Sequence, residues 1–184
     1  MSYIERQFAK TSHFCAMKNP IINISVSAAM ASIIGKMLYF IFLAPDDTFD
    51  MYTRFFYLLC FLVALFIGLR IWKQQNPNLV FTEDVKSGMK IVSIYAIIIS
   101  AFTFLYYKVI NPTYFSSKIQ AAVDAVEATG SNGADLEQVR NTASFVFNAF
   151  THSTLTLFGL MVIGFFYTLI LTLLFRYKPK AFGL

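Results

Sequence analysis

The sequence predicts an all-α fold: a polytopic membrane protein with a four-transmembrane-helix bundle and an extracytoplasmic helical hairpin between helices 3 and 4. Hydrophobic residues make up 57% of the 184 residues and charged residues only 14%, whereas soluble domains average about 25% charged. Four apolar runs approach the roughly 20 helical residues that cross a bilayer core of about 30 Å. These predicted spans are 21–43, 55–72, 89–110 and 153–175.

Prolines bracket the predicted helices. All five lie outside the spans, at Pro20, Pro45, Pro77, Pro112 and Pro179. Proline restricts its own backbone and that of the preceding residue, so it suits helix starts and loops. We therefore expect four unbroken spans. The third helix should begin near Thr82 as the N-cap, with acidic residues in its first turn, and should end before Asn111.

The segment between spans three and four, residues 113–150, predicts two helices joined by a turn. Apolar residues recur at helical spacing, at Ile119, Ala122, Val123 and Val126 in the first arm and at Leu136, Val139, Ala143, Val146 and Phe150 in the second. Between the arms, residues 129–133 read TGSNG, which is typical of a turn. The apolar stripe must be covered by the partner arm, the bilayer surface or another protein.

The distribution of basic residues predicts the topology. If the N-terminus is cytoplasmic, ten of the 15 basic residues flank the spans on the inner side and four lie outside. The positive-inside rule then favours both termini in the cytoplasm. Residues 1–20 would form a cytoplasmic leader, 21–178 the membrane domain and 179–184 a cytoplasmic tail. Basic residues in flanking positions suit anionic headgroups, so membrane lipids are expected partners and nucleic acid is not.

The sequence shows no catalytic or metal-binding constellation. Cys15 and Cys60 cannot readily meet, and the chain has no CxxC, HExxH, P-loop or GxSxG motif. Asp46, Asp47 and Asp50 cluster in the first outer loop, where a solvated loop is favoured over a divalent-cation site because EF-hand spacing is absent. We therefore expect no catalytic, cofactor or metal site, and a protein that is not an enzyme.

Lys36 is the one charged residue well inside a predicted span, which makes it a candidate functional site. It lies about 10 Å below the outer end of its helix, so its ammonium could snorkel outward or bond a neighbouring carbonyl. A contact with an anionic lipid or a partner carboxylate is the alternative. His152, beside hydroxyl residues near the outer end of the fourth span, is a second candidate for such a contact, with an interfacial structural role as the simpler interpretation.

Small residues mark one face of the first helix as its packing surface. They recur in steps of three and four, at Ser25, Ala28, Ser32 and Gly35. Small side chains let helix backbones approach closely in lipid. Lys36 adjoins this face and should point into the bundle or its outer mouth. Gly159 and Gly164 are expected to serve similarly on the fourth helix.

Two short motifs give the chain a family resemblance. The segment FTEDVKSG at 81–88 leads into the third span, and NPTY at 111–114 follows it. Over residues 20–178 the arrangement resembles an uncharacterised family of four-span bacterial membrane proteins, domain of unknown function 4199. The resemblance implies a location in the bacterial inner membrane and a loose association with lipid-linked sugar transfer. It brings no functional residues with it.

The leading prediction is a non-catalytic accessory or scaffold subunit of a membrane complex. It depends on the amphipathic outer hairpin and on the absence of recognisable catalytic motifs from the sequence. A protein partner or a second copy would bind through the hairpin or through the cytoplasmic loop 73–90. The alternative is a small carrier or flippase for lipids or lipid-linked substrates, which would use Lys36 to meet an anionic headgroup. The predicted spans contain no proline or acidic residue, which disfavours a proton-coupled transporter.

Overall fold

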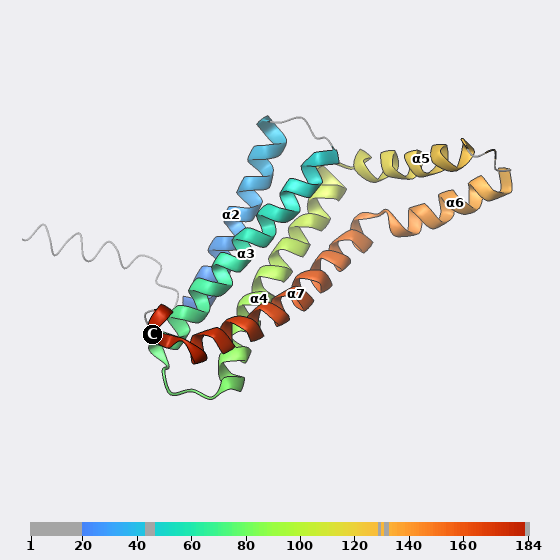
Figure 1. The fold of residues 1–184 in the computed structure, drawn as a ribbon. Helices are drawn as coiled ribbons and strands as arrows, with labels where there is room; N and C mark the ends of the chain where they lie inside the picture. Colours follow the sequence, from blue (N-terminus) through green and yellow to red (C-terminus); the bar gives the residue numbers. More distant parts are fainter. Residues whose placement is uncertain (1–19, 43–46, 129, 131–132, 183–184) are drawn as a thin grey trace, which may run out of the picture.

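The computed structural model describes residues 20–42, 47–128, 130 and 133–182, and these residues form an all-helical protein (Figure 1). The long helices are α2 (Pro20–Phe42), α3 (Asp47–Gln75), α4 (Phe81–Leu105) and α7 (Ala149–Tyr177). A π-helical turn, η1 (Tyr106–Ile110), extends α4. The shorter helices α5 (Thr113–Glu127) and α6 (Gly133–Val146) lie between η1 and α7, and a 3-10 turn, η2 (Pro179–Phe182), follows α7. The predicted fold class is confirmed.

Each of the four long helices is long and apolar enough to cross a membrane. The candidate spans are Pro20–Phe42, Met51–Gln75, Phe81–Ile110 and Ala149–Tyr177, so each predicted span falls on its own helix. The outward surfaces of these helices are apolar: Leu59, Ile97 and Phe158 are 59%, 59% and 63% exposed. A soluble monomer rarely exposes an extensive apolar surface, whereas such a surface suits contact with lipid tails.

The helix α4 begins within one residue of the predicted start near Thr82 and carries Glu83 and Asp84 in its first turn, as expected. Its first residue is Phe81, and Val80 occupies the N-cap position without a side-chain cap bond. The expectation that Thr82 caps this helix is wrong, because Thr82 already lies inside the first turn. The candidate span Phe81–Ile110 accordingly holds Glu83 and Asp84 in its first turn, ahead of the predicted apolar span 89–110. The positive end of the helix dipole favours an acid at this position.

The third span ends, on the hairpin side, in a π-helical turn that continues α4 without breaking the span. The backbone N–H of Asn111 donates to the carbonyl of Tyr106 over 2.9 Å, the five-residue pairing of a π-turn. Pro112 has no N–H with which to continue the helix. Two successive side chains, Tyr106 and Tyr107, are only 0% and 3% exposed, so both face the interior.

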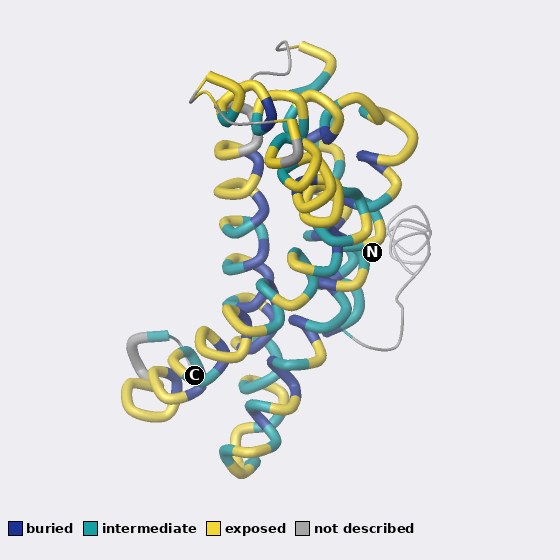
Figure 2. The backbone as a smooth tube through the Cα atoms, turned by 90° about the vertical axis from the view of Figure 1, so that its right-hand side faces the viewer, coloured by how far each residue is buried: buried dark blue, intermediate teal, exposed yellow. Residues whose placement is uncertain are grey.

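The helix α4 is the centre of the bundle and contacts α2, α3 and α7. Its buried apolar residues recur at each turn, at Ile91, Val92, Tyr95, Ala96 and Ile99. The helix α7 runs antiparallel to it: Arg176 bonds Asp84 near one end, and the Ser100 hydroxyl donates to the carbonyl of Ser153 over 2.8 Å toward the other. In Figure 2 the buried residues follow the inward sides of the long helices.

The arms α5 and α6 pack on each other and project to one side of the bundle (Figure 1). Val123 on α5 and Ala143 on α6 are the buried positions of the predicted apolar stripes. The partner arm covers these two positions, whereas Val146 and Phe150 of the second stripe stay exposed. Gly130, in the turn between the arms, has φ of 79°, a left-handed conformation that glycine adopts without a steric penalty.

The predicted C-terminal tail, residues 179–184, packs back onto the bundle through η2. The ring of Phe182 lies 5.0 Å from that of Phe175 and 6.0 Å from that of Phe66. Residues 183–184 lie outside the described part of the chain, as does the predicted leader except for Pro20.

Candidate functional site at the outer end of the bundle

Lys36 lies in a box of tyrosine rings at the outer end of the bundle, which we define as the end that carries the hairpin. Its ammonium nitrogen is 3.9 Å from the ring centroid of Tyr106, 4.7 Å from that of Tyr107 and 5.9 Å from that of Tyr57. The residue is 3% exposed. A desolvated contact between a cation and a ring is worth about 2 kcal/mol. Lys36 therefore points into the bundle instead of snorkelling along its lipid face.

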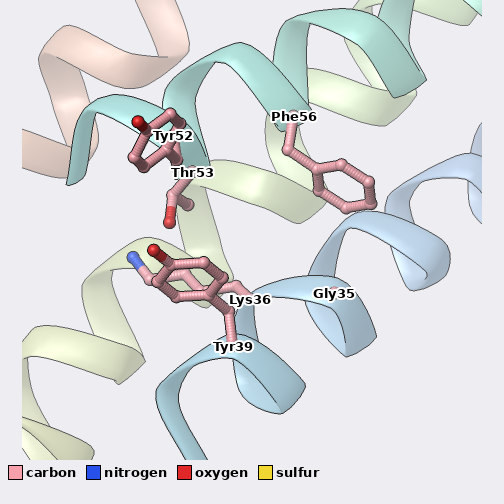
Figure 3. Close-up of a pocket in the computed structure, with 6 residues that line it drawn as sticks. All are labelled: Gly35, Lys36, Tyr39, Tyr52, Thr53 and Phe56. Atoms are coloured by element: carbon pink, nitrogen blue, oxygen red, sulfur yellow. The ribbon is translucent and has the colours of Figure 1, made fainter. Parts of the chain in front are cut away.

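A pocket of about 450 Å³ adjoins Lys36 between α2 and α3. Its lining residues are Gly35, Lys36, Tyr39, Tyr52, Thr53 and Phe56. In Figure 3 the side chains of Lys36 and Tyr39 reach from α2 toward Thr53 on α3. Aromatic walls with a few polar groups are the usual composition of a small-molecule site. The pocket therefore suits a ligand with an apolar part and an anionic or hydrogen-bonding head.

A pair of hydroxyls links three helices directly beneath the tyrosine box. The hydroxyl oxygens of Ser32 and Tyr95 are 2.7 Å apart, and Tyr95 donates to the backbone carbonyl of Tyr57 over 2.8 Å. These contacts join α2, α4 and α3. They fix the backbone of Tyr57, whose ring forms one wall of the box.

The predicted packing face of α2 does meet the rest of the bundle. Ser25 and Ser32 are fully buried, and Ala28 is half-buried against the central core. Gly35 lies so close to the ring of Phe56 that any Cβ would collide with it. The small-residue pattern thus predicted the surface along which α2 packs.

The two glycines of α7 differ from each other. Gly164 lies against Val92 of α4, and a Cβ there would also come within 2.9 Å of the Phe61 ring. Gly159 has open space where its Cβ would be. The packing role expected for both residues therefore applies to Gly164 and is wrong for Gly159.

His152 and Lys36, the two residues predicted to contact a lipid or partner, meet at one ring. The His152 ring lies edge-on to Tyr107, with 5.1 Å between centroids, and 5.8 Å from the ring of Phe115. The Lys36 ammonium approaches the same Tyr107 ring at 4.7 Å. Residues from α2, η1, α5 and α7 therefore form one aromatic cluster, which the sequence pattern did not reveal.

A second charged cluster, at the inner end of the bundle, was not predicted. The Oδ2 atom of Asp84 accepts from Lys73 Nζ over 3.0 Å and from two nitrogens of Arg176 over 2.7 and 3.1 Å. Arg176 also donates to the carbonyl of Leu79 over 2.6 Å. This inner clasp joins α3, α4, α7 and the connection 76–80. The acidic pair Glu83–Asp84 at a helix start, with basic residues nearby in the sequence, is the signal that could have indicated it.

The described residues contain no group of three or more His, Cys, Asp or Glu side chains that could hold a metal ion. In the predicted acidic loop, Asp46 and the side chains of Asp47 and Asp50 lie outside the described part, as does Cys15. Cys60 is a half-buried free thiol on α3. The chemistry of the described site is therefore that of a caged cation, tyrosine rings and hydroxyls.

Four membrane-length helices with apolar outward surfaces define a multi-pass membrane protein. Within that class, the chain belongs to the family described as protein of unknown function (DUF4199), whose model matches residues 24–177. The match covers the hairpin and nearly all of the four spans. No curated protein and no solved structure matches the chain.

Proposed function

We propose that the protein is a non-catalytic accessory or scaffold subunit of a membrane complex, and that its partner binds the α5–α6 hairpin. The observation that carries this proposal is the position of the hairpin, whose arms pack mainly on each other and project beside the bundle (Figure 1). Two helices of 15 and 14 residues exceed what the connection of two spans requires. A surface presented in this way suits contact with another protein.

A groove of about 440 Å³ along α6 is the proposed contact surface. Its lining residues recur at each turn of the helix, at Asp135, Gln138, Val139, Thr142, Ala143, Val146 and Phe147. Apolar side chains interspersed with polar ones are usual in non-obligate protein interfaces. The helices α5 and α6 together carry four carboxylates and two cations, a net charge of −2, which favours a partner with a basic surface.

The segment 73–90, the other predicted partner surface, supports docking less well. Most of it is helical, because α3 ends at Gln75 and α4 begins at Phe81. Lys73 donates a hydrogen bond to Asp84, and Arg176 donates one to the carbonyl of Leu79 in the connection between α3 and α4. The exposed and projecting hairpin is therefore the better candidate.

We also propose that the hairpin faces the outside of a bacterial inner membrane and that both termini are cytoplasmic. Support comes from basic residues near the inner ends of α3, α4 and α7, namely Arg70, Lys73, Lys86, Lys90 and Arg176. Alkaline phosphatase is active only outside the cytoplasm. A phosphatase fused after Gly130 should be active, and one fused after Leu184 should be inactive. The opposite pattern would mean that the hairpin is cytoplasmic and the C-terminus is outside.

Crosslinking in intact membranes followed by purification in mild detergent tests the partner proposal. The wild type should purify with one discrete partner, and Thr142→Arg, in the groove, should lose it. Ala121→Arg is the matched control, because Ala121 is exposed on α5 and does not line the groove. Recovery of the wild type as a lone monomer, or equal loss in both variants, would contradict the proposal.

A small lipid carrier or flippase is the second candidate, favoured by the pocket beside Lys36. In this function the ammonium would meet an anionic headgroup while the aromatic walls hold the apolar part. Lys36→Met removes the charge and keeps an unbranched side chain, with Lys108→Met, at an exposed position, as its control. Selective loss of lipid binding and transport in Lys36→Met would favour the carrier, and unchanged transport would remove Lys36 from the mechanism.

A further inference from the structure

The short junction between α6 and α7, residues 145–150, exposes an unusual amount of apolar surface. Phe145 is 78% exposed, Phe150 69% and Val146 47%. We name this junction the elbow. The hairpin does not cover these side chains, because α5 and α6 bury Val123 and Ala143 between them instead.

The exposed surface of the elbow continues the lipid-facing surface of α7. Exposed apolar side chains on this helix are Leu155, Phe158, Val162 and Phe166. Phe150 lies two turns beyond Phe158, in the direction of the hairpin. Contact with lipid along α7 is therefore expected to extend to the elbow.

The length of α7 places the elbow at the depth of lipid headgroups. Because its groups are charged, we place the inner clasp between Arg176 and Asp84 among the headgroups on the side of the membrane opposite the hairpin. Phe150 precedes Arg176 by 26 residues, a rise of about 39 Å along the helix axis. A hydrocarbon core of about 30 Å within a bilayer of roughly 40–45 Å leaves Phe150 in the headgroup region. Aromatic rings concentrate at this depth in membrane proteins.

The backbone of the elbow is satisfied by protein side chains, although the helix is interrupted there. Asn148 Nδ2 donates to the carbonyl of Phe145 over 2.7 Å, and the Thr151 hydroxyl donates to the same carbonyl over 3.2 Å. In return, Asn148 Oδ1 accepts from the backbone N–H of Thr151 over 2.8 Å. These bonds cap α7 and satisfy backbone groups at the interruption, so that it can lie near lipid.

We infer that the elbow inserts into the phospholipid leaflet on the hairpin side, with Phe145 and Phe150 as its anchors. The inference depends on exposure, depth and backbone bonding, and it holds for either orientation of the protein. The anchoring rings of Phe145 and Phe150 do not line the groove along α6, although Val146 and Phe147 of the elbow do; the test of insertion therefore uses the anchor position Phe145.

Depth-dependent fluorescence quenching tests this insertion. Trp72 is the single tryptophan, so Trp72→Phe provides a silent background for Phe145→Trp in phosphatidylcholine vesicles brominated at defined acyl positions. We expect shallow bromines to quench Phe145→Trp at least about twofold more than Ala121→Trp on the hairpin. Leu155→Trp, one turn into α7, should be quenched best by deeper bromines.

Two results would overturn the inference: quenching of Phe145→Trp no greater than that of Ala121→Trp, or equal access of aqueous iodide to both. If Trp72→Phe does not fold, the same substitutions can be made with Trp72 retained. The wild-type signal is then subtracted, and the same two results decide the outcome.

Discussion

The two ends of the bundle hold buried charge in different ways. At the inner end, Asp84 accepts hydrogen bonds from Lys73 and Arg176, so opposite charges meet directly. At the outer end, Lys36 lies among the rings of Tyr57, Tyr106 and Tyr107. The inner clasp joins helices through geometry-specific ion pairs. The outer box surrounds a cation with polarisable walls beside a 450 Å³ pocket.

This difference indicates a division of labour between the ends. An ion-paired cluster with short bonds stabilises one arrangement of α3, α4 and α7 and leaves little space for a ligand. A tyrosine box beside a pocket, next to a projecting hairpin, offers surfaces to other molecules. We therefore assign stability mainly to the inner end, and the proposed interaction uses the outer end.

The largest effect is expected at the inner clasp. Asp84→Asn leaves two cations close together without their carboxylate, and removing one partner of a buried pair costs about 3–5 kcal/mol. The free energy of unfolding, measured by titration with denaturing detergent in mixed micelles, should fall by that amount. Glu83→Gln is the control, because the Glu83 side chain is 46% exposed and its ion pair with Lys86 is 4.0 Å long. A loss below about 1 kcal/mol for Asp84→Asn would mean that the inner clasp contributes little to stability.

A smaller loss is expected in the packed middle of the bundle, which both ends share. Gly164→Ala forces a methyl group against Val92 and Phe61 and should destabilise the protein by about 1–3 kcal/mol. Gly159→Ala meets open space and should be neutral or slightly stabilising, because alanine is the better helix former. Thermal unfolding in detergent would compare the pair, and equal midpoints would show that α7 does not pack as described.

The tyrosine box should give a measurable coupling energy. A double-mutant cycle with Lys36→Met and Tyr106→Leu is expected to yield about 1–2 kcal/mol, since the contact is desolvated and 3.9 Å long. The matched cycle uses Lys108→Met and Phe104→Leu, in which Lys108 is exposed and 5.3 Å from the ring centroid. That cycle should give less than about 1 kcal/mol. Equal coupling energies in the two cycles would mean that burial does not strengthen the contact between the Lys36 ammonium and the Tyr106 ring.

The smallest effect is expected for the hydroxyl pair beneath the box. Tyr95→Phe removes the hydroxyl that joins Ser32 to the carbonyl of Tyr57, and interhelical bonds of this kind are worth about 1 kcal/mol in membranes. Tyr167→Phe makes the same chemical change at a position that is 36% exposed. The unfolding free energy should distinguish them, and an equal change in both would contradict a linking role for Tyr95.

The fold could be predicted from sequence because lipid imposes a simple rule on composition. Apolar runs located the four spans, and the small residues Ser25 and Ser32 located the packing face of α2. The start of α4 was predicted to within one residue, near Thr82 instead of Phe81, but the burial of Asp84 was not, because basic side chains from α3 and α7 neutralise it. Such neutralisation depends on tertiary contacts.

The candidate site was predicted only in part. Lys36 stood out because a charge inside an apolar run is rare. Tyrosines gave no such signal, since they are common near membrane surfaces. The π-turn that directs both Tyr106 and Tyr107 inward also has no reliable sequence signature. The meeting of Lys36 and His152 at one ring is a consequence of antiparallel packing between distant segments.

The central claim is that the outer end, through its hairpin, contacts another protein. Site-specific photo-crosslinking in living cells tests it most directly, with a benzophenone side chain at Gln138 in the groove or at Ala121 on α5. We predict one discrete adduct from position 138, lost on adding Thr142→Arg, and none from position 121. No adduct at position 138, or the same adducts from both positions, would contradict the claim.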